Sequence, residues 1–300
     1  MNLRRYSKKK GFSKLIRKEY LIEKGFFTLA MVMIATVLLM FAFVVIESLP
    51  AFGHSGFFNF LVGLRWSPDM NIFGIFPMIV GSILTTAISL IIAVPMSVSC
   101  AIYLEEMAPA KLKDYFKPVI QTLAGIPSVI YGFFGLTLIA PIIRNIFGGS
   151  GFSILTASVV LALMILPTII SLSQDAIKSV PNQFREASFG LGSTQWQCIK
   201  YIILPTALPG IITAIILGMG RAVGETLAVL MLAGNVSVIP SSLASPIRTL
   251  TSNIALEMGY ATGIHYSALF ATGVILFMVI MVLMIVSTYV QSRYALKEGF

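Results

Sequence analysis

Charged residues and cysteines are scarce in this 300-residue chain. Asp, Glu, Lys and Arg together make up 11% of it, whereas soluble domains contain about 25%. Apolar residues reach 57%, and the mean hydropathy is +0.92. This shortage of charge excludes an ordinary soluble domain. It predicts an integral membrane protein, in which the unit of organisation is a span of about 20 apolar residues.

The chain has only two cysteines and two histidines. Cys100 and Cys198 are both expected at or near the cytoplasmic side, and they predict no disulfide framework. His54 and His265 are far apart in sequence and are expected on the opposite side, so no metal site is predicted. The sequence also lacks a GxxxxGK(S/T) phosphate loop. The chain is therefore not expected to be an enzyme, and ATP hydrolysis would belong to a partner.

The apolar residues are concentrated in six runs. We expect spans over residues 28–49, 73–103, 118–143, 152–172, 203–233 and 264–290. The first run is too long for the core of a cleaved signal peptide, so we expect it to be retained. The sequence thus predicts an all-α integral membrane protein with six transmembrane helices.

The segments before and after the spans are expected in the cytoplasm. Residues 1–27 form a basic arm whose apolar residues recur at helical spacing, which suits the anionic surface of the inner leaflet. A nucleic-acid-binding arm is the competing interpretation. Residues 291–300 form a short tail that carries two further basic residues.

The distribution of Lys and Arg predicts how the chain is oriented. Seventeen of them fall on the side that holds both termini and the connection 173–200, whereas the other side has three, Arg65, Arg144 and Arg248. Short loops rich in Lys and Arg stay in the cytoplasm. We therefore expect both termini and residues 173–200 inside. The net charge of +9 then needs no nucleic-acid partner to explain it.

Residues 173–200 are a polar stretch between two apolar runs. A helix connection needs only about 2 to 8 residues, so this stretch does more than reverse the chain. Pro181 suits the first turn of a helix and Ser179 its cap, which predicts a short helix over 182–197. Four small residues leave one side of it nearly bare: Ala187, Ser188, Gly190 and Gly192. A bare surface lets another backbone approach closely, although a solvated helical hairpin is the alternative.

One basic residue, Arg221, falls inside the fifth span. A charge near the bilayer centre costs about 2.5 to 3.5 kcal/mol and usually faces a bundle interior or a wet cavity. Glu225 is four residues further on, so the two are expected to share a helix face and to pair. Gly220 and Gly224 predict a tight helix crossing beside them. Because a guanidinium matches a tetrahedral oxyanion bidentately, Arg221 is a candidate for the substrate pathway, with a purely structural ion pair as the alternative.

The long connection after the fifth span contains a second candidate helix. Ser245 can cap it and Gly259 can follow its end, so an amphipathic helix is expected over 245–259 at the outer boundary. Its apolar face consists of Ile247, Leu250, Ile254 and Met258. Arg248 and Glu257 lie on the same helix. They are expected either to help close the outer mouth or contact an outer partner, or to form a solvated face.

The spacing of residues from Glu186 to Pro205 resembles a motif of a known family. Glu186, Ala187 and Ser188 are followed after three residues by Gly192, and nine residues later by Ile202 and then Leu204-Pro205. This resembles the EAA loop of ABC-importer permeases, with Ser188 where that family usually has a second Ala. The resemblance implies the type I, MetI-like permease fold. It also implies that residues 186–192 form a coupling helix that sits in a groove of an ATPase subunit.

Three longer stretches, residues 125–135, 210–235 and 248–259, are similar to the PstC family of phosphate permeases. This resemblance implies one half of the pathway of an ATP-driven importer of inorganic phosphate in the prokaryotic plasma (inner) membrane. The implied partners are a second permease of the PstA type, a PstB-type ATPase dimer that holds ATP and Mg, and an external PstS-type phosphate-binding protein. The chain itself would hold no cofactor. Arg221 and Glu225 match the residues that the family associates with phosphate passage.

Other functions remain open on the sequence. Within transport, the chain is also compatible with a permease for another oxyanion, such as molybdate, or with the PstA-like partner subunit. From a different class, it is compatible with a passive anion channel or a membrane scaffold. Competition among anions for uptake distinguishes the alternatives within transport. Co-purification of an ATPase distinguishes an importer from a channel or a scaffold.

Overall fold

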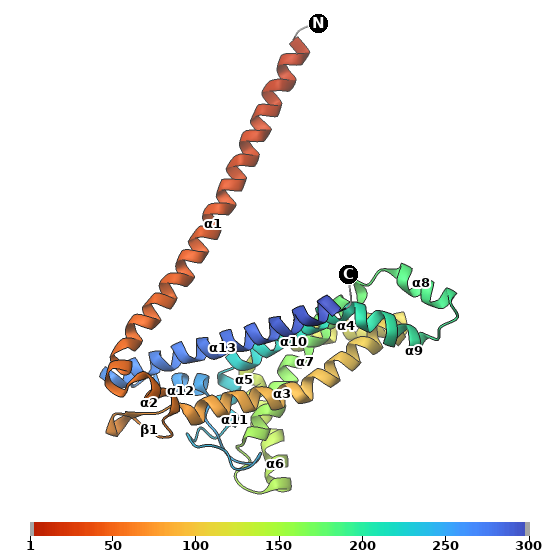
Figure 1. The fold of residues 1–300 in the computed structure, drawn as a ribbon. Coiled ribbons are helices and arrows are strands. Elements are labelled where there is room, and N and C mark those ends of the chain that lie inside the picture. Colours follow the sequence, from red (N-terminus) through yellow and green to blue (C-terminus); the bar gives the residue numbers. More distant parts are fainter. Residues whose placement is uncertain (1–2, 298–300) are drawn as a thin grey trace.

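The computed structural model describes residues 3–297 of the chain, and the side chains of residues 20–289 and 291–292. Part of the expected arm, residues 1–2, and part of the expected tail, residues 298–300, lie outside the described residues. The described chain is a bundle of helices with a short two-stranded hairpin. Its first helix leans away from the bundle (Figure 1).

The elements follow one another along the chain as a series of helices interrupted by short turns. Up to the third span they are α1 (Leu3–Ser55), α2 (Phe57–Val62), β1 (Trp66–Ser67), η1 (Pro68–Met70), β2 (Ile72–Phe73), α3 (Phe76–Ile102), η2 (Tyr103–Met107), α4 (Ala110–Gly125), α5 (Ser128–Phe134), η3 (Gly135–Ile139) and α6 (Ala140–Phe147). The remainder are α7 (Ile154–Lys178), α8 (Asn182–Gly190), α9 (Gln195–Cys198), η4 (Ile199–Ile203), α10 (Leu204–Gly224), α11 (Leu227–Leu232), α12 (Leu250–Glu257) and α13 (Gly263–Lys297). The two strands pair antiparallel.

Six helical segments of the described chain are long and apolar enough to cross a membrane. They are Tyr20–Ser55, Phe76–Met107, Ser128–Phe147, Ile154–Lys178, Gln195–Gly224 and Gly263–Tyr289. A helix satisfies its backbone N–H and C=O groups internally, which the hydrocarbon core of a bilayer requires. The prediction of a helical membrane protein with six spans is confirmed.

The third expected span, residues 118–143, is divided in the structure. Helix α4 ends at Gly125, and Ile126 is extended with a ψ of 129°. The reason is Pro127, whose ring disfavours helical geometry at the residue before it. The crossing helix therefore begins at Ser128, as α5, and continues through η3 into α6.

The fourth span, α7, is the core of the bundle. Within its apolar stretch, 67% of the residues are buried inside the chain, more than in any of the other five spans. It packs against α3 and α10, and Leu161, Ile165 and Ile169 of this helix are among the largest fully buried side chains. Arg221 and the pocket beside Glu225, described below, both adjoin this central helix.

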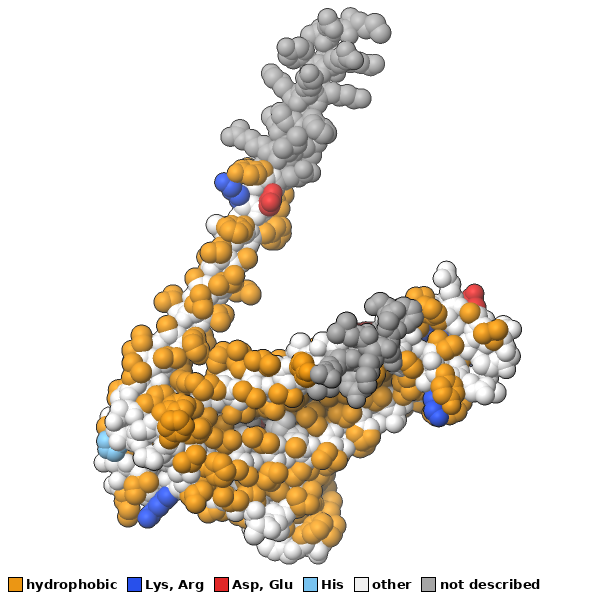
Figure 2. All heavy atoms as spheres, in the orientation of Figure 1, with side chains coloured by type: hydrophobic (Ala, Val, Ile, Leu, Met, Phe, Trp, Pro, Cys, Tyr) orange, Lys and Arg blue, Asp and Glu red, His pale blue; other side chains and the backbone are white. Residues whose placement is uncertain are grey.

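The first span, α1, is the opposite case, because none of its apolar stretch is buried. Apolar side chains cover its surface along most of the part shown in colour (Figure 2). It contacts α13 through two aromatic pairs, Phe41 with Phe277 at 4.9 Å and Phe43 with Phe270 at 5.7 Å between ring centroids. The rest of its apolar surface is available to lipid or to another subunit.

Candidate functional site

Arg221 lies on α10, one turn before the helix ends, and is half-buried. Its Nη1 donates a hydrogen bond to Thr168 Oγ1 of α7 at 3.2 Å. It is also close enough to Tyr131 of α5 for the two side chains to interact electrostatically. Among the described residues, no carboxylate lies within ion-pair distance of Arg221. The charge of this guanidinium is thus left without a counter-ion in a segment expected to cross the membrane.

The predicted ion pair between Arg221 and Glu225 is wrong. Residues four apart share a face only if the helix continues through both, but α10 ends at Gly224 and Glu225 is extended with a ψ of 129°. Glu225 Oε1 instead accepts a hydrogen bond from Ala228 N at 3.2 Å, at the start of α11. The backbone carbonyl of Glu225 accepts one from Thr251 Oγ1 at 2.9 Å.

The predicted close crossing at Gly220 and Gly224 is also wrong. A Cβ added at Gly224 would meet nothing within 4 Å, and one at Gly220 would meet only Met284 Cε at 3.9 Å. The close approach of α10 to α7 is made elsewhere, at Gly218. There a Cβ would lie 2.7 Å from Ile169 Cγ1, so the absence of a side chain lets the two helices meet.

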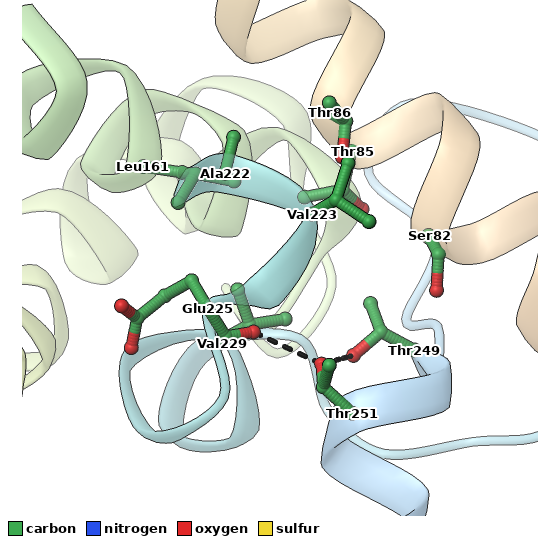
Figure 3. A pocket seen from close by; sticks show the side chains of 10 residues that line it. All are labelled: Ser82, Thr85, Thr86, Leu161, Ala222, Val223, Glu225, Val229, Thr249 and Thr251. Carbon is green, nitrogen blue, oxygen red and sulfur yellow. Dashed lines mark hydrogen bonds between the residues drawn. The ribbon is translucent and has the colours of Figure 1, made fainter. Parts of the chain in front are cut away.

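A small polar pocket lies beside Glu225, between α3, α7, α10, α11 and α12 (Figure 3). Its polar lining comes from hydroxyl groups of α3 and of the segment that leads into α12: Ser82, Thr85, Thr86, Thr249 and Thr251. Figure 3 shows the Glu225 carboxylate directed away from the Thr249 and Thr251 hydroxyls. The free volume is about 10 Å³, which is room for about one water molecule. In this conformation the pocket is too small for a phosphate ion.

These hydroxyl residues are not among the sites predicted from the sequence, although a signal is present there. Ser82, Thr85, Thr86 and Ser89 recur three or four residues apart in an otherwise apolar helix, and all four are buried. Thr85 and Ser89 donate to carbonyls of their own helix at 2.7 and 2.8 Å, and Ser158 of α7 donates to Thr85 O at 3.2 Å. A buried polar stripe on an apolar helix indicates a helix that faces the bundle interior.

The single helix predicted over 182–197 is two helices in the structure, α8 and α9. Gly192 lies between them with a φ of +81°, a left-handed conformation that favours glycine and ends the helix. The cap prediction at Ser179 is wrong, since Pro181 occupies the N-cap position of α8. Helix α9 has its own capping box, in which Thr194 accepts from Gln197 N at 3.3 Å.

The bare surface predicted for this segment is present at its two glycines. A Cβ added at Gly190 or at Gly192 would meet nothing within 4 Å. Glu186 and Ala187 are exposed, and Leu191 is 90% exposed. Ser188 differs from them, because it is buried against Ser193 and its hydroxyl bonds to that residue. The segment thus presents glycines and an apolar side chain outward.

Glu257 is the centre of a buried cluster at the end of α12. Its Oε1 accepts a hydrogen bond from Arg248 Nη1 at 2.6 Å. Its Oε2 lies 2.8 Å from Trp66 Nε1 in the hairpin and 2.8 Å from His265 Nε2 in α13. Only 6% of the Glu257 side chain is exposed. The solvated face that was one alternative for Arg248 and Glu257 is therefore wrong.

The expected helix over 245–259 is shorter in the structure, and the segment buries polar residues as well as the expected Ile247 and Leu250. It runs from Leu250 to Glu257, and Thr249 caps it by accepting from Ser252 N at 3.2 Å. Polar residues are buried along it, including Ser252 and Asn253, which are fully buried. Beside the cluster, Tyr260 has a pKa raised above its ordinary value, first by desolvation and then by the negative charge of Glu257.

The Glu257 cluster and helix α8 lie at opposite ends of the bundle. In Figure 1, α12 and the hairpin are at one end, α8 and α9 are at the other, and α3, α7 and α10 run between them. Arg221, near the end of α10, lies between the two ends of the chain's membrane region. Six spans with an exposed helical segment at one end define the class of protein: a multi-pass membrane protein.

The chain belongs to the family described as binding-protein-dependent transport system inner membrane component, whose model matches residues 93–296. The probable ABC transporter permease protein YqgH of Bacillus subtilis is 40% identical to it over 271 residues, covering 88% of each chain. The phosphate transport system permease protein PstC of Pasteurella multocida is 37% identical over 273 residues, covering 84% of each.

Solved structures agree on the fold. A chain of a bacterial alginate ABC transporter, in complex with a pentasaccharide-bound periplasmic protein, superposes with a TM-score of 0.65 at 16% identity. The similarity covers 93% of this chain and 96% of that one. The fold is that of a type I ABC importer permease, as expected, and the protein is a multi-pass membrane transport subunit.

Proposed function

We propose that this chain forms one half of the translocation pathway of an ATP-driven importer of inorganic phosphate. Its relatives named as phosphate permeases support this, because one of them matches 91% of the chain at 34% identity. The proposal places both termini and the α8 segment in the cytoplasm, as the excess of Lys and Arg on that side favours.

Arg221 is the observation that carries the proposal. A guanidinium without a carboxylate partner in a low-dielectric segment attracts an anion strongly, and its donor geometry fits a tetrahedral oxyanion. Thr168 occupies one donor of Arg221 at 3.2 Å and fixes the direction of the side chain. Among the described residues this guanidinium has no other hydrogen-bond acceptor, so its remaining donors can bind a passing phosphate. Because this chain offers phosphate a single guanidinium at Arg221, phosphate is expected to bind weakly enough to be released.

Glu225 is proposed to support the passage of phosphate without acting as the counter-ion of Arg221. Its carboxylate is held at the start of α11 by Ala228 N, where the partial positive charge of a helix N-terminus favours an anion. This keeps the carboxylate away from Arg221. In the proposal, Glu225 lines the pathway and the guanidinium stays available for substrate.

Residues 186–192 are proposed to dock on the ATPase dimer, which binds ATP and Mg. The open glycines at 190 and 192 and the exposed Leu191 suit close contact with another protein. Closure of the ATPase dimer then moves α8, and the spans alternate between outward-open and inward-open states. The ATPase can shift this equilibrium only by its different affinity for the two states.

The other partners follow from the same proposal. A second, PstA-like permease completes the pathway, and a PstS-like binding protein delivers phosphate to the outer mouth. Arg248 and Glu257 are proposed to shape that mouth. Since their charges are satisfied by each other, they are expected to hold the outer elements together rather than to bind phosphate directly.

The proposal is tested by the change Arg221→Gln in the assembled complex. Phosphate uptake should fall to background while the ATPase still co-purifies. Arg144→Gln is the matched control, because it removes the same charge from an exposed position at the end of α6. Undiminished uptake by Arg221→Gln would reduce Arg221 to a structural role.

Two measurements decide between this function and its rivals. Competition by sulfate or molybdate for phosphate uptake identifies a permease for another oxyanion, and identification of the co-purifying permease distinguishes a PstA-like role. A passive channel or scaffold predicts that no ATPase co-purifies through residues 182–197. The phosphate importer predicts that an ATPase does.

A further inference from the structure

Arg185 of α8 forms an ion pair with Glu106 in η2, the π-turn that continues α3. Arg185 Nη2 donates to Glu106 Oε1 at 2.6 Å, and Nε donates to Oε2 at 3.5 Å. The two side chains are only 18% and 10% exposed. The pair is therefore poorly screened by solvent and salt, unlike a surface ion pair.

Arg185 and Glu106 also form hydrogen bonds with the ends of two further helices. Arg185 Nη1 donates to Val180 O at 2.6 Å, and Nη2 donates to Ile177 O at 3.1 Å, at the end of α7. Gln195 of α9 donates from Nε2 to Glu106 O at 2.6 Å. Four segments, η2, the end of α7, α8 and α9, meet at this pair. We refer to it as the Glu106–Arg185 joint.

Apart from the joint and the contacts of α8 with α9 and η4, the chain around α8 is open. After the helix comes a turn at Gly192, which has a φ of +81° and where an added Cβ would meet no atom within 4 Å. Phe189 and Leu191 are 50% and 90% exposed. A helix that projects in this way can pivot on its two connections. A fixed contact to the body of the protein is needed for its movement to be passed on.

Helix α3 leads from the joint to the opposite end of the bundle. It is helical for 27 residues, from Phe76 to Ile102, a length of about 40 Å. At its far end Ser82 Oγ accepts a hydrogen bond from Leu250 N at 2.9 Å. Gly81 lies directly against Arg248, because a Cβ there would be 2.6 Å from Arg248 O. A shift of α3 therefore has to displace this outer segment.

The geometry points to a transmission path: the Glu106–Arg185 joint passes the movement of α8 to α3, and α3 passes it to the outer segment 248–250. The inference rests on the proposed function, in which an ATPase moves α8. Glu106 and Arg185 act as positioning residues, since they connect the docking helix to α3 without contacting substrate. Breaking the joint separates ATP hydrolysis from transport while residues 186–192 still dock.

A charge exchange across the joint tests this inference. The complex with its second permease and ATPase is placed in proteoliposomes with the binding protein, and the phosphate transported per ATP hydrolysed is measured. The variants are Glu106→Arg, Arg185→Glu, the two together, and Glu106→Gln in case a charge reversal prevents assembly. Lys111→Glu is the control, because it reverses an exposed charge at the start of α4, outside the joint.

The expected result is a loss of coupling that the exchange restores. The single variants and Glu106→Gln should lower the transport-to-hydrolysis ratio by about 3- to 30-fold, and the double variant should recover most of it. The control should match the unaltered chain. A purely structural role would lower assembly and both rates together. A normal ratio in the single variants, or no recovery in an assembled double variant, would overturn the inference.

A second measurement tests the joint independently of whether phosphate is the substrate. In a chain without Cys100 and Cys198, a cysteine replacing Ala255, which is exposed on α12, reports movement of the outer end by its labelling rate. ATP should change this labelling rate when the joint is unaltered. It should not change the rate in Arg185→Glu, and it should change it in the double variant. If this pattern is observed but no phosphate is taken up, phosphate is not the substrate, and the role of the joint in transmitting movement is supported. An identical response in all variants overturns the joint alone.

Discussion

The two ends of the bundle satisfy their polar and apolar groups in opposite ways. At the end that holds α12 and the hairpin, Glu257 binds Arg248, Trp66 and His265 at 2.6 to 2.8 Å and is almost fully buried. At the other end, the α8 segment leaves Leu191 90% exposed and its glycines without neighbours. The α12 end thus pairs its buried charges within this chain. The α8 end has the open surface that a docking partner requires.

Arg221 belongs to neither pattern. It is half-buried, less than Glu257, and among the described residues it has one side-chain hydrogen bond, to Thr168, and no counter-ion. Three regions of the described chain therefore differ: the α12 end has a buried, paired carboxylate, Arg221 has no counter-ion, and the α8 end has an exposed apolar side chain. In the proposed function, Arg221 binds an anion and the α8 end binds a protein.

Substitution of Gly192 by Trp should have the largest effect on function. A non-glycine residue at a φ of +81° costs roughly 1 to 2 kcal/mol, and an indole would cover the open surface. We expect the ATPase to stop co-purifying and phosphate uptake to fall to background, while the chain still inserts in the membrane. Gly149→Trp is the matched control, since Gly149 also has a positive φ and no neighbour within 4 Å. Normal assembly and uptake in Gly192→Trp would refute the docking assignment.

Substitution of Glu257 by Gln should have the largest effect on stability. The change keeps the shape but leaves the part-buried Arg248 without its counter-ion, which costs about 3 to 5 kcal/mol. Thermal unfolding of the purified chain in detergent measures this loss, and ATPase binding should persist in the folded fraction. Glu186→Gln, on exposed α8, should change the unfolding free energy by less than about 0.5 kcal/mol. Equal losses in the two variants would contradict the contrast between the two ends.

Substitution of Trp66 by Phe should have a smaller effect of the same kind. It keeps an aromatic ring against Phe73 and His265 but removes the hydrogen bond from Nε1 to Glu257. A hydrogen bond to a charged group contributes about 1.5 to 3 kcal/mol, so the unfolding temperature should fall less than in Glu257→Gln. If it falls more, the ring packing and not the Glu257 cluster holds the hairpin in place.

The spans were predictable because each depends only on a local run of apolar residues. The EAA-like spacing likewise marked the segment from Glu186 onward, which forms part of the exposed helix α8. The predictions of finer geometry were wrong where a single residue changed the course of the backbone. Gly192 divides the predicted helix through its positive φ, and the helix end at Gly224 removes Glu225 from the face of Arg221.

The Glu257 cluster could not be predicted from the sequence, for a different reason. Glu257 meets Trp66, which is 191 positions away in sequence, and His265 on another helix. No local pattern signals such contacts, so an amphipathic surface helix was the natural prediction for a segment that is in fact built into the core. The hydroxyl stripe of α3 at Ser82, Thr85 and Ser89 was visible in the sequence, but its partners on α12 were not.

The account depends on phosphate movement being driven by a partner that binds ATP. The most direct measurement is the uptake of labelled phosphate into proteoliposomes that contain the complete complex, with and without enclosed ATP and with and without external binding protein. The account predicts uptake only when both are present, and none with Arg221→Gln. Equal phosphate entry in the absence of ATP would contradict it and would identify the chain as part of a passive channel.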